Sequence, residues 1–501
     1  MKHLTLVCSM LVACATAHAQ APLANLIQNG ERAAALEAIH ARGADVNATQ
    51  GDGTTALHWA VYKVDRELVT ELLKSGANPD VTNKYGSSPL AEAAKLGNLE
   101  LVRQLLDAGA NVESPNADGE TALMLAARIG SLDVAKLLVE RGADVNATEA
   151  WRDQTALIWA VDNNFPELTQ FLIDNGANAN ARASANDWES QITAEPRAQY
   201  RPVGGLTVLL YAARSGCTRC VRSLLAAGAD IDKPTPEGMT PLMIAIDNQA
   251  YDTARLLLDE GANPQIWDWY GRTALYVAVD MSTFRGRQPH PTVSSETSAT
   301  DLVRLLLEAG VNPNAQLNMH RPSRGGNIGR FADELFTTGT TPLLRAAIGA
   351  DVDAASLLLE HGALVDLPDV HGITPLMAAA GHVSGRNRPV DSQSAQVRAI
   401  ELLGLFLAAG ADINAKITDN HSRTANVGRQ PNAVMEREGQ TALYGAAKFG
   451  WANVVEFLLS RGADPNVKDA LGKTPLDGTV SEEVATLLRG VAAGRGPIAS
   501  R

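Results

Sequence analysis

The stretch TALMLAA (121–127), followed by DVAKLLVERGADVN (133–146), decides the fold of this 501-residue chain. Its first segment begins with Thr121, whose hydroxyl suits a helix N-cap, and continues with small residues that let neighbouring helices approach closely. Its second segment carries a Leu-Leu run and ends at Gly142, a residue that stops a helix by adopting a left-handed conformation. The stretch therefore predicts two short helices followed by a projecting turn rich in Asp and Asn.

The same pattern recurs along the chain, most often with a period of 33 residues. Its Thr/Ser-x-Leu core starts at residues 55, 88, 121, 155, 207, 240, 273, 341, 374, 441 and 474. The three much longer intervals have the length of one or two periods that carry inserts. Because a single helix pair cannot bury its apolar face alone, the repetition predicts a stack of pairs with polar ends.

These units resemble the ankyrin repeat, which begins T-P-L-H-x-A and ends with a Leu-Leu run and a Gly-Ala-Asp-x-Asn turn. The resemblance spans nearly the whole chain beyond its N-terminal segment, with 22–49 and 474–490 as incomplete end units. It implies an all-α solenoid of about 11–12 units with short β-hairpin fingers, which recognises proteins through its concave and finger surfaces. The His of the motif survives only as His58. We therefore expect packing to replace most of the polar bridging between repeats that this His would make.

The N-terminus has the features of a targeting segment. A short basic start precedes the apolar residues 4–16, and 17–19 form a small-x-small cleavage pattern. We expect residues 1–19 to be a signal peptide cleaved after Ala19, and the mature protein to be periplasmic or secreted. Alternatively, residues 11–14 resemble a bacterial lipobox, which would make Cys14 a lipid anchor. No later apolar run is long enough for a membrane span.

Five inserts interrupt the solenoid, which we assign to 20–490, with 491–501 as a flexible C-terminal tail. The first, third and fifth inserts follow a Gly-Ala-Asn/Asp turn or its equivalent, so we expect them to lengthen fingers. The second and fourth lie between the two helices of a unit and should emerge at the opposite edge. Such insertions either form binding loops or are tolerated decoration. The inserts are 181–205, 281–299, 317–338, 381–397 and 416–437.

The inserts are rich in arginine, with 13 Arg against nine Asp and Glu. Arg recognises carboxylates and phosphates through paired hydrogen bonds. These side chains either hold an anionic small molecule or glycan, or pair with the acidic solenoid and fix the loops. The candidates are Arg285, Arg287, Arg321, Arg324, Arg330, Arg386 and Arg388.

Aromatic residues gather in the predicted fingers, where polar residues are usual. Exposed Trp and Tyr are good anchors for a protein partner. The alternative is that they pack on neighbouring fingers. The partner-binding candidates of this kind are Trp151, Trp188, Tyr200, Trp267, Trp269 and Tyr270.

The chain has four cysteines, of which two lie in the leader. The other two, Cys217 and Cys220, begin an outer helix, and Cys220 occupies a position that is apolar in other units. We interpret them as a structural pair that can form a disulfide. Thiol–disulfide exchange at a helix N-terminus is the alternative.

The remaining function classes have little support in the sequence. A net charge of −13 argues against nucleic-acid binding. No motif for a metal, a cofactor or a catalytic nucleophile is present. We therefore predict a monomeric, non-enzymatic scaffold for an unidentified protein partner. A receptor for an anionic ligand and a redox accessory using Cys217 and Cys220 remain the alternatives.

Overall fold

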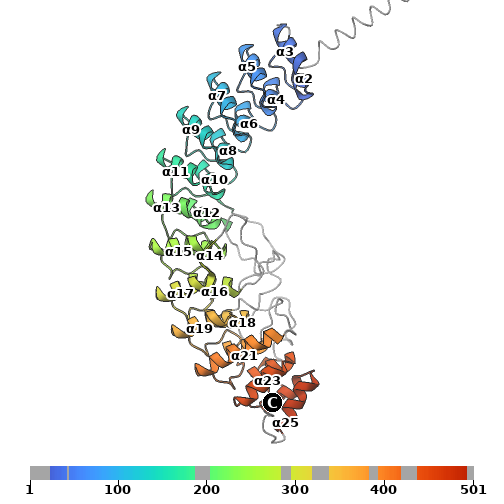
Figure 1. Ribbon diagram of the computed structural model, residues 1–501, viewed down its shortest axis with the longest axis vertical. Helices are drawn as coiled ribbons and strands as arrows, with labels where there is room; N and C mark the ends of the chain where they lie inside the picture. Colours follow the sequence, from blue (N-terminus) through green and yellow to red (C-terminus); the bar gives the residue numbers. More distant parts are fainter. Residues whose placement is uncertain are drawn as a thin grey trace, which may run out of the picture. The chain divides into compact units, whose positions relative to one another are not determined.

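The computed structural model describes residues 23–41, 44–186, 203–283, 295–318, 338–382, 393–418 and 437–492 (Figure 1). The chain divides into two compact units. Unit 1 lies within 1–185 and 204–230, and unit 2 within 186–203 and 231–501. In their described parts, each unit contains six helix pairs. The all-α ankyrin-type solenoid predicted from the period is therefore confirmed.

Unit 1 contains α2 (Leu23–Gln28), α3 (Arg32–His40), α4 (Ala56–Tyr62), α5 (Arg66–Lys74), α6 (Pro89–Lys95), α7 (Leu99–Asp107), α8 (Ala122–Ile129), α9 (Leu132–Glu140), α10 (Ala156–Asp162), α11 (Pro166–Asp174), α12 (Val208–Ser215) and α13 (Thr218–Ala226). Two strands of two residues, β1 (Ala185–Asn186) and β2 (Val203–Gly204), precede α12.

Unit 2 contains α14 (Pro241–Asp247), α15 (Tyr251–Asp259), α16 (Ala274–Thr283), α17 (Ala299–Glu308), α18 (Pro342–Gly349), α19 (Val352–Glu360), α20 (Pro375–Met377), the π-helical turn η2 (Ala378–His382), α21 (Gln393–Ala408), α22 (Ala442–Phe449), α23 (Ala452–Ser460), α24 (Pro475–Gly478) and α25 (Glu482–Ala492). Helix α20 and η2 together occupy the place of one inner helix.

Within each unit the helices form two rows. In unit 1 the first helices of successive pairs contact one another from α2 to α12, and the second helices do so from α3 to α13 (Figure 1). In unit 2 the same relation links α14, α16, α18, η2, α22 and α24, while α15 to α25 form the outer row. The apolar side chains between the rows are buried, as Leu57, Leu123 and Leu157 show.

The inner helices begin where the sequence predicts. The hydroxyl groups of Thr121, Thr155 and Thr207 each accept a hydrogen bond from the backbone N–H three residues later. This caps amides that have no partner inside the helix. Pro241 and Pro342 occupy the first helical position, where their missing N–H costs nothing.

The fingers are turns more than β-hairpins. Among the described residues, their strand pairing is limited to the two-residue pair β1–β2 and to isolated bridges such as Thr49–Thr55 and Trp267–Thr273. A side-chain acceptor shapes the turn instead: Asn116 Oδ1 accepts from the N–H groups of residues 118 and 120, at 3.0 and 2.8 Å. Because this carboxamide oxygen replaces ladder bonds, the predicted β-hairpin shrinks to a side-chain-capped turn.

Adjacent fingers are also bonded to each other. In unit 1, Lys84 N donates to Asp52 O at 2.8 Å and Ala150 N donates to Asp118 O at 2.8 Å. Gly119 permits the second approach, since it has φ +81° and a Cβ there would lie 2.8 Å from Ala150 N, and Gly86 plays the same part against Ala117. The fingers therefore form a continuous edge within the unit.

Polar bridging between repeats is stronger than the sequence suggested. His58 makes the expected link, a 2.9 Å contact from its Nε2 to Ser87 O in the next repeat. A second kind of link comes from the final Asn of the Gly-Ala-Asp-x-Asn turn. Asn146 Nδ2 donates to Gly176 O at 2.9 Å, and Asn146 Oδ1 accepts from Asn178 N at 2.8 Å. At the positions equivalent to His58, apolar residues such as Met124 and Ile158 are buried, so packing replaces the His there, and the Asn links add to it.

Asn and Asp residues repeat this ladder in both units. Asn47, Asn180, Asn314 and Asn414 make the same pair of links to the next repeat. Each link satisfies a backbone group at a helix end that would otherwise need water.

The described ends of the inserts show how they leave the solenoid. Leu317 and Ile417 are buried, and each accepts a hydrogen bond from the glycine that closes its finger, Gly339 and Gly439. The described ends of the third and fifth inserts therefore lie in fingers, and their full extent stays a prediction. The fourth is shorter than predicted, because α21 already begins at Gln393 and the last residues of 381–397 belong to this helix.

Candidate partner-binding surface

Unit 1 presents two highly exposed aromatic side chains in its fingers. Trp151 is 76% exposed and Tyr85 is 72% exposed. The carboxylate of Glu149 accepts hydrogen bonds from the backbone N–H groups of residues 151, 152 and 154 at 2.6–3.0 Å. The finger backbone is thereby fixed while the Trp151 indole is left in solvent.

The inner-helix face of unit 1 carries a second group of aromatic residues. On α4, the rings of Trp59 and Tyr62 meet edge to face, with centroids 5.7 Å apart and an interplanar angle of 89°. Trp59 Nε1 donates to Gln50 Oε1 at 2.8 Å, which holds the indole in place. Tyr62 remains 56% exposed. Aromatic side chains that are held in place and partly exposed to solvent, as in this pair, often anchor protein interfaces.

Further along the same face, aromatic rings and ion pairs alternate. The Arg128 guanidinium lies 5.6 Å from the Trp159 ring centroid and pairs with Glu120 at 2.9 Å. Trp159 Nε1 is buried and has no hydrogen-bond partner among the described residues.

The next pair of inner helices continues the alternation. Arg214 on α12 lies 4.7 Å from the ring centroid of Tyr211 and pairs with Asp162 on α10 at 2.7 Å. Both ion-pair side chains are partly exposed, at 41% and 30%. The face therefore offers rings together with charges of both signs.

Sequence reasoning missed this inner face because it considered exposed aromatic residues only in the predicted fingers. A signal existed. Trp59, Trp159 and Tyr211 all stand four residues after a Thr N-cap, at the helix position that faces away from the outer helices.

In unit 2, one finger carries three of the predicted aromatic residues, and these differ in their exposure. Trp267 is 61% exposed and Trp269 is 45% exposed, whereas Tyr270 is 5% exposed. The Tyr270 N–H donates to Asp268 Oδ1 at 3.0 Å, and its ring lies 5.6 Å from the Arg272 guanidinium. Tyr270 therefore supports the turn from inside, and the two tryptophans supply its exposed surface.

Cys217 and Cys220 form a disulfide at the start of α13. Cys217 caps this helix, with its Sγ accepting from Cys220 N at 3.1 Å. The two side chains are only 2% and 0% exposed. The bond is therefore part of the core beneath α13, and its sulfur atoms are shielded from a dissolved thiol.

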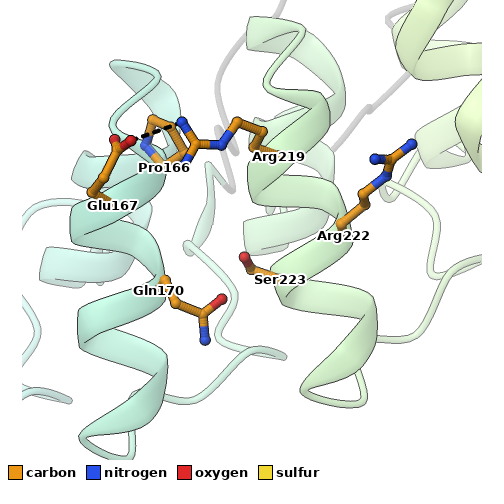
Figure 2. A pocket seen from close by; sticks show the side chains of 6 residues that line it. All are labelled: Pro166, Glu167, Gln170, Arg219, Arg222 and Ser223. Atoms are coloured by element: carbon orange, nitrogen blue, oxygen red, sulfur yellow. Dashed lines mark hydrogen bonds and ion pairs between the residues drawn. The ribbon is translucent and has the colours of Figure 1, made fainter.

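A hollow on the outer row of unit 1 lies above this disulfide, between α11 and α13. Figure 2 shows Glu167 and Gln170 on one helix facing Arg219 and Ser223 on the other. The Glu167–Arg219 pair at 2.7 Å lowers the pKa of the Glu167 carboxyl below its usual value. Both side chains are more than 60% exposed, so the pair is screened by solvent and contributes little stability. The lining contains neither His nor Cys, and this arrangement suits a surface contact more than a reaction.

The remaining predicted residues lie outside the described residues. They are Cys14, Trp188, Tyr200, Arg285, Arg287, Arg321, Arg324, Arg330, Arg386 and Arg388. Within the ranges given above, no cluster of three or more metal-binding side chains is present. In the same ranges, no helix combines the length and apolarity that crossing a bilayer requires.

Curated relatives share the repeats over part of their length. The B-cell lymphoma 3 protein homolog of Mus musculus is 29% identical over 274 residues, covering 54% of this chain and 47% of the relative. The phosphocholine transferase AnkX of Legionella pneumophila is 26% identical over 269 residues, covering 54% and 23%. A putative ankyrin repeat-containing protein of Treponema pallidum is 36% identical over 110 residues, covering 22% and 32%. The chain spans less than half the length of each relative.

Family models match most of the chain. The model for three ankyrin repeats matches 23–116, 63–149, 93–183, 148–234, 184–268 and 209–317. A single-repeat model matches 338–370, and one for many copies matches 428–478. Together with the stacked helix pairs, the capped turns and the bonded fingers, these matches show that the chain belongs to the ankyrin-repeat family.

Proposed function

We propose that this protein is a non-enzymatic, monomeric scaffold that holds a protein partner in the periplasm or after secretion. The observation that carries the proposal is the set of exposed aromatic side chains on the finger edge and inner face of unit 1. Tyr62, Tyr85 and Trp151 are each more than half exposed. Apolar rings of this size favour burial, and their backbone is already held by the finger and ladder hydrogen bonds.

This arrangement suits protein recognition because little order must be gained on binding. The capped turns and the inter-repeat ladder fix the spacing between aromatic anchors, so the entropic cost of ordering the surface is small. Mixed charges such as Arg128 and Asp162 provide a polar rim, which contributes specificity and association rate.

Two observations support an extracytoplasmic location. The leader pattern at 1–19 is typical of export. The Cys217–Cys220 disulfide also suits an oxidising compartment, since such bonds persist there and are rare in the cytosol. Cell fractionation and mass spectrometry of the mature N-terminus test this part. A chain starting at Gln20 supports it, a lipidated Cys14 replaces soluble export by anchoring, and an intact Met1 in the cytosol contradicts it.

An affinity capture tests the scaffold. The full chain, with or without Tyr62→Ala plus Trp151→Ala, is used to capture proteins from an extract of the source organism. We expect one stoichiometric partner with the parent chain and at least about tenfold less with the variant, corresponding to the loss of about 1.4 kcal/mol. The parent chain and the double variant should have the same melting temperature, since both substituted side chains are exposed.

Leu364→Ala is the matched control, because Leu364 is 58% exposed and lies in unit 2. It should capture the partner as the parent chain does. Equal recovery with the aromatic variant would remove this surface from the proposal, and the absence of any stoichiometric partner would remove the scaffold itself.

The alternative functions have less support. AnkX is named a phosphocholine transferase, but in this chain the described hollows lack a nucleophile paired with a base. The burial of Cys217 and Cys220 disfavours exchange chemistry. The anionic-ligand receptor depends on arginines outside the described residues and stays a prediction.

A further inference from the structure

We propose that a hollow in the fingers of unit 2 binds a cationic side chain, Lys or Arg, of the protein partner. We call it the Trp267 hollow. This inference rests on the proposed scaffold function and adds the chemistry of one contact. The lining residues are Pro236, Glu237, Gly238, Trp267, Asp268, Trp269 and Asn318.

The hollow lies where two successive fingers meet. The backbone N–H of Trp269 donates to Glu237 O at 2.9 Å, which joins the two fingers directly. Gly238 makes this approach feasible, because it has φ +88° and a Cβ there would lie 3.0 Å from the Asp268 Cα. The two indoles and the carboxylate of Glu237 are therefore brought together by the backbone, before any ligand arrives.

A buried ion pair holds the tryptophan finger in shape. Asp268 Oδ1 accepts from the N–H groups of Tyr270 and Arg272, at 3.0 and 2.9 Å. Asp268 Oδ2 accepts from Arg272 Nε at 2.7 Å. An antiparallel bridge between Trp267 and Thr273 closes the base of the same turn. The platform is thus preorganised, which lowers the cost of binding.

The charges at the hollow favour a cation. The negative charge of Asp268 is compensated internally by Arg272, and both side chains are almost fully buried. Glu237 has no ion-pair partner in the part of the chain that the structure describes. The lining contains no Lys, Arg or His. What remains is one half-exposed carboxylate beside two indole rings.

Indole faces attract cations through their quadrupole, and Trp is the strongest aromatic partner for Lys and Arg. At an exposed site this interaction contributes a fewfold gain in affinity, and the carboxylate of Glu237 adds an attraction that salt screens. An anionic group would meet repulsion from Glu237. A purely apolar group would leave this carboxylate partly desolvated without compensation.

The test uses the full chain and three capped tripeptides, Ac-Gly-Lys-Gly-NH2, the Arg analogue, and the norleucine analogue as the neutral isostere. Binding is followed by ¹⁹F NMR of fluorotryptophan-labelled protein. We expect the Lys and Arg peptides to shift the Trp267 and Trp269 resonances, with affinity about fivefold above that of norleucine.

Variants locate the effect. Trp267→Ala plus Trp269→Ala should abolish the binding without changing the melting temperature. Glu237→Gln should weaken it about two- to fivefold at low salt and flatten its salt dependence. Glu260→Gln is the matched control, an exposed carboxylate away from the hollow, and should bind as the parent chain does.

Each other outcome overturns the inference. Equal binding of the norleucine peptide means that the contact is apolar. Unchanged binding by the Glu237→Gln variant means that the carboxylate does not attract the peptide. A neutral oligosaccharide that shifts both resonances when the peptides do not means a glycan surface. Undisturbed partner capture by the double Trp variant refutes this contact while leaving the scaffold proposal intact, whereas the scaffold fails only if the parent chain captures no partner.

Discussion

The two units differ at one repeated helix position, four residues after the N-cap of each inner helix. In unit 1 this position carries large or charged side chains that reach the surface in several repeats. In unit 2 it carries smaller residues or a buried arginine. The residues are Trp59, Glu92, Leu125, Trp159 and Tyr211 in unit 1, and Ile244, Val277, Arg345, Ala378 and Gly445 in unit 2.

The same helix position therefore serves surface display in unit 1 and internal packing in unit 2. In unit 1 the position displays side chains on the inner face, as with Trp59 and Trp159. In unit 2 it contributes to internal structure: Arg345 Nε donates to Asp280 Oδ1 at 2.8 Å, and both side chains are below 5% exposure. We therefore expect substitutions at this position to change binding in unit 1 and stability in unit 2.

Removal of the buried arginine should have the largest effect. Arg345→Ala leaves the Asp280 carboxylate buried without its cation, and we expect unit 2 to lose about 3–5 kcal/mol of unfolding free energy. Urea unfolding followed by segment-resolved hydrogen exchange measures this for unit 2 alone.

Unit 1 offers the matched control. Arg214→Ala breaks a pair of similar length, 2.7 Å, whose side chains are 41% and 30% exposed. Its cost should stay below about 1 kcal/mol. Similar losses for the two variants would contradict the contrast between a buried and a displayed position.

The glycine at this position in α22 gives the next largest effect. A Cβ on Gly445 would lie 2.6 Å from Cδ2 of His382, whose ring is buried and contacts Thr441 O at 2.5 Å through Nε2. Gly445→Ala should therefore displace the ring and cost about 2 kcal/mol, measured by thermal unfolding.

Glu92→Ala is the control at the equivalent position in unit 1. The Glu92 carboxylate makes a long contact, 3.9 Å, to Lys95. We expect a change within about 0.5 kcal/mol. If the glycine variant were as benign, His382 would have room that the packing does not suggest.

The fold could be predicted from the sequence because each repeat uses local chemistry. In most repeats a Thr hydroxyl before Pro-Leu or Ala-Leu caps a helix, and a left-handed Gly ends the next helix, as Thr121 and Gly142 show. Thr441 is an exception without a side-chain cap bond. The inter-repeat ladder could not be read in the same way. Asn146 is ambiguous in sequence, since its amide serves equally well in a local turn or in a link to the next repeat.

The candidate surface could be predicted less well, because exposure depends on a side chain's direction within a turn. Trp269 and Tyr270 are adjacent and both aromatic, yet one is 45% and the other 5% exposed. Asp268 sets this direction through its hydrogen bonds to two backbone amides. Tyr62 was missed because exposed aromatic residues were considered only in the predicted fingers.

Both neutral and ionisable side chains cap the finger turns, and one ionisable cap in unit 2 predicts a pH effect. Asn83 and Asn116 cap turns in unit 1, where Asp369 does so in unit 2. Burial raises the pKa of Asp369 to about 6. The folded chain therefore holds this proton more tightly than the unfolded chain, so unit 2 gains stability as pH falls through 6 towards 4 and loses it as pH rises.

Asp369→Asn should remove this dependence. The amide keeps an oxygen for the N–H groups of His371 and Ile373 but cannot ionise, so we expect it to stabilise unit 2 by about 1–2 kcal/mol at pH 7.5 and by little at pH 4. Melting curves at both pH values measure the difference. Asp259→Asn changes an exposed carboxylate in the same unit and should leave the pH profile as it is. A variant less stable than the parent at pH 7.5 would show that the charge itself holds the turn.

The ladder between repeats gives the smallest effect and compares the two units most directly. Asn146→Ala in unit 1 removes two links, of 2.9 and 2.8 Å, and should cost about 1 kcal/mol. Asn414→Ala in unit 2 removes a longer amide link of 3.4 Å and one of 2.9 Å, so its cost should be nearer about 0.5 kcal/mol. Hydrogen exchange at the amides of Asn178 and Asp464, the donors that lose their acceptors, measures each loss at its own junction. If the variant in unit 2 cost more than the one in unit 1, bond length would not set the strength of the ladder, and the stiffness of each junction would have to come from its helix packing.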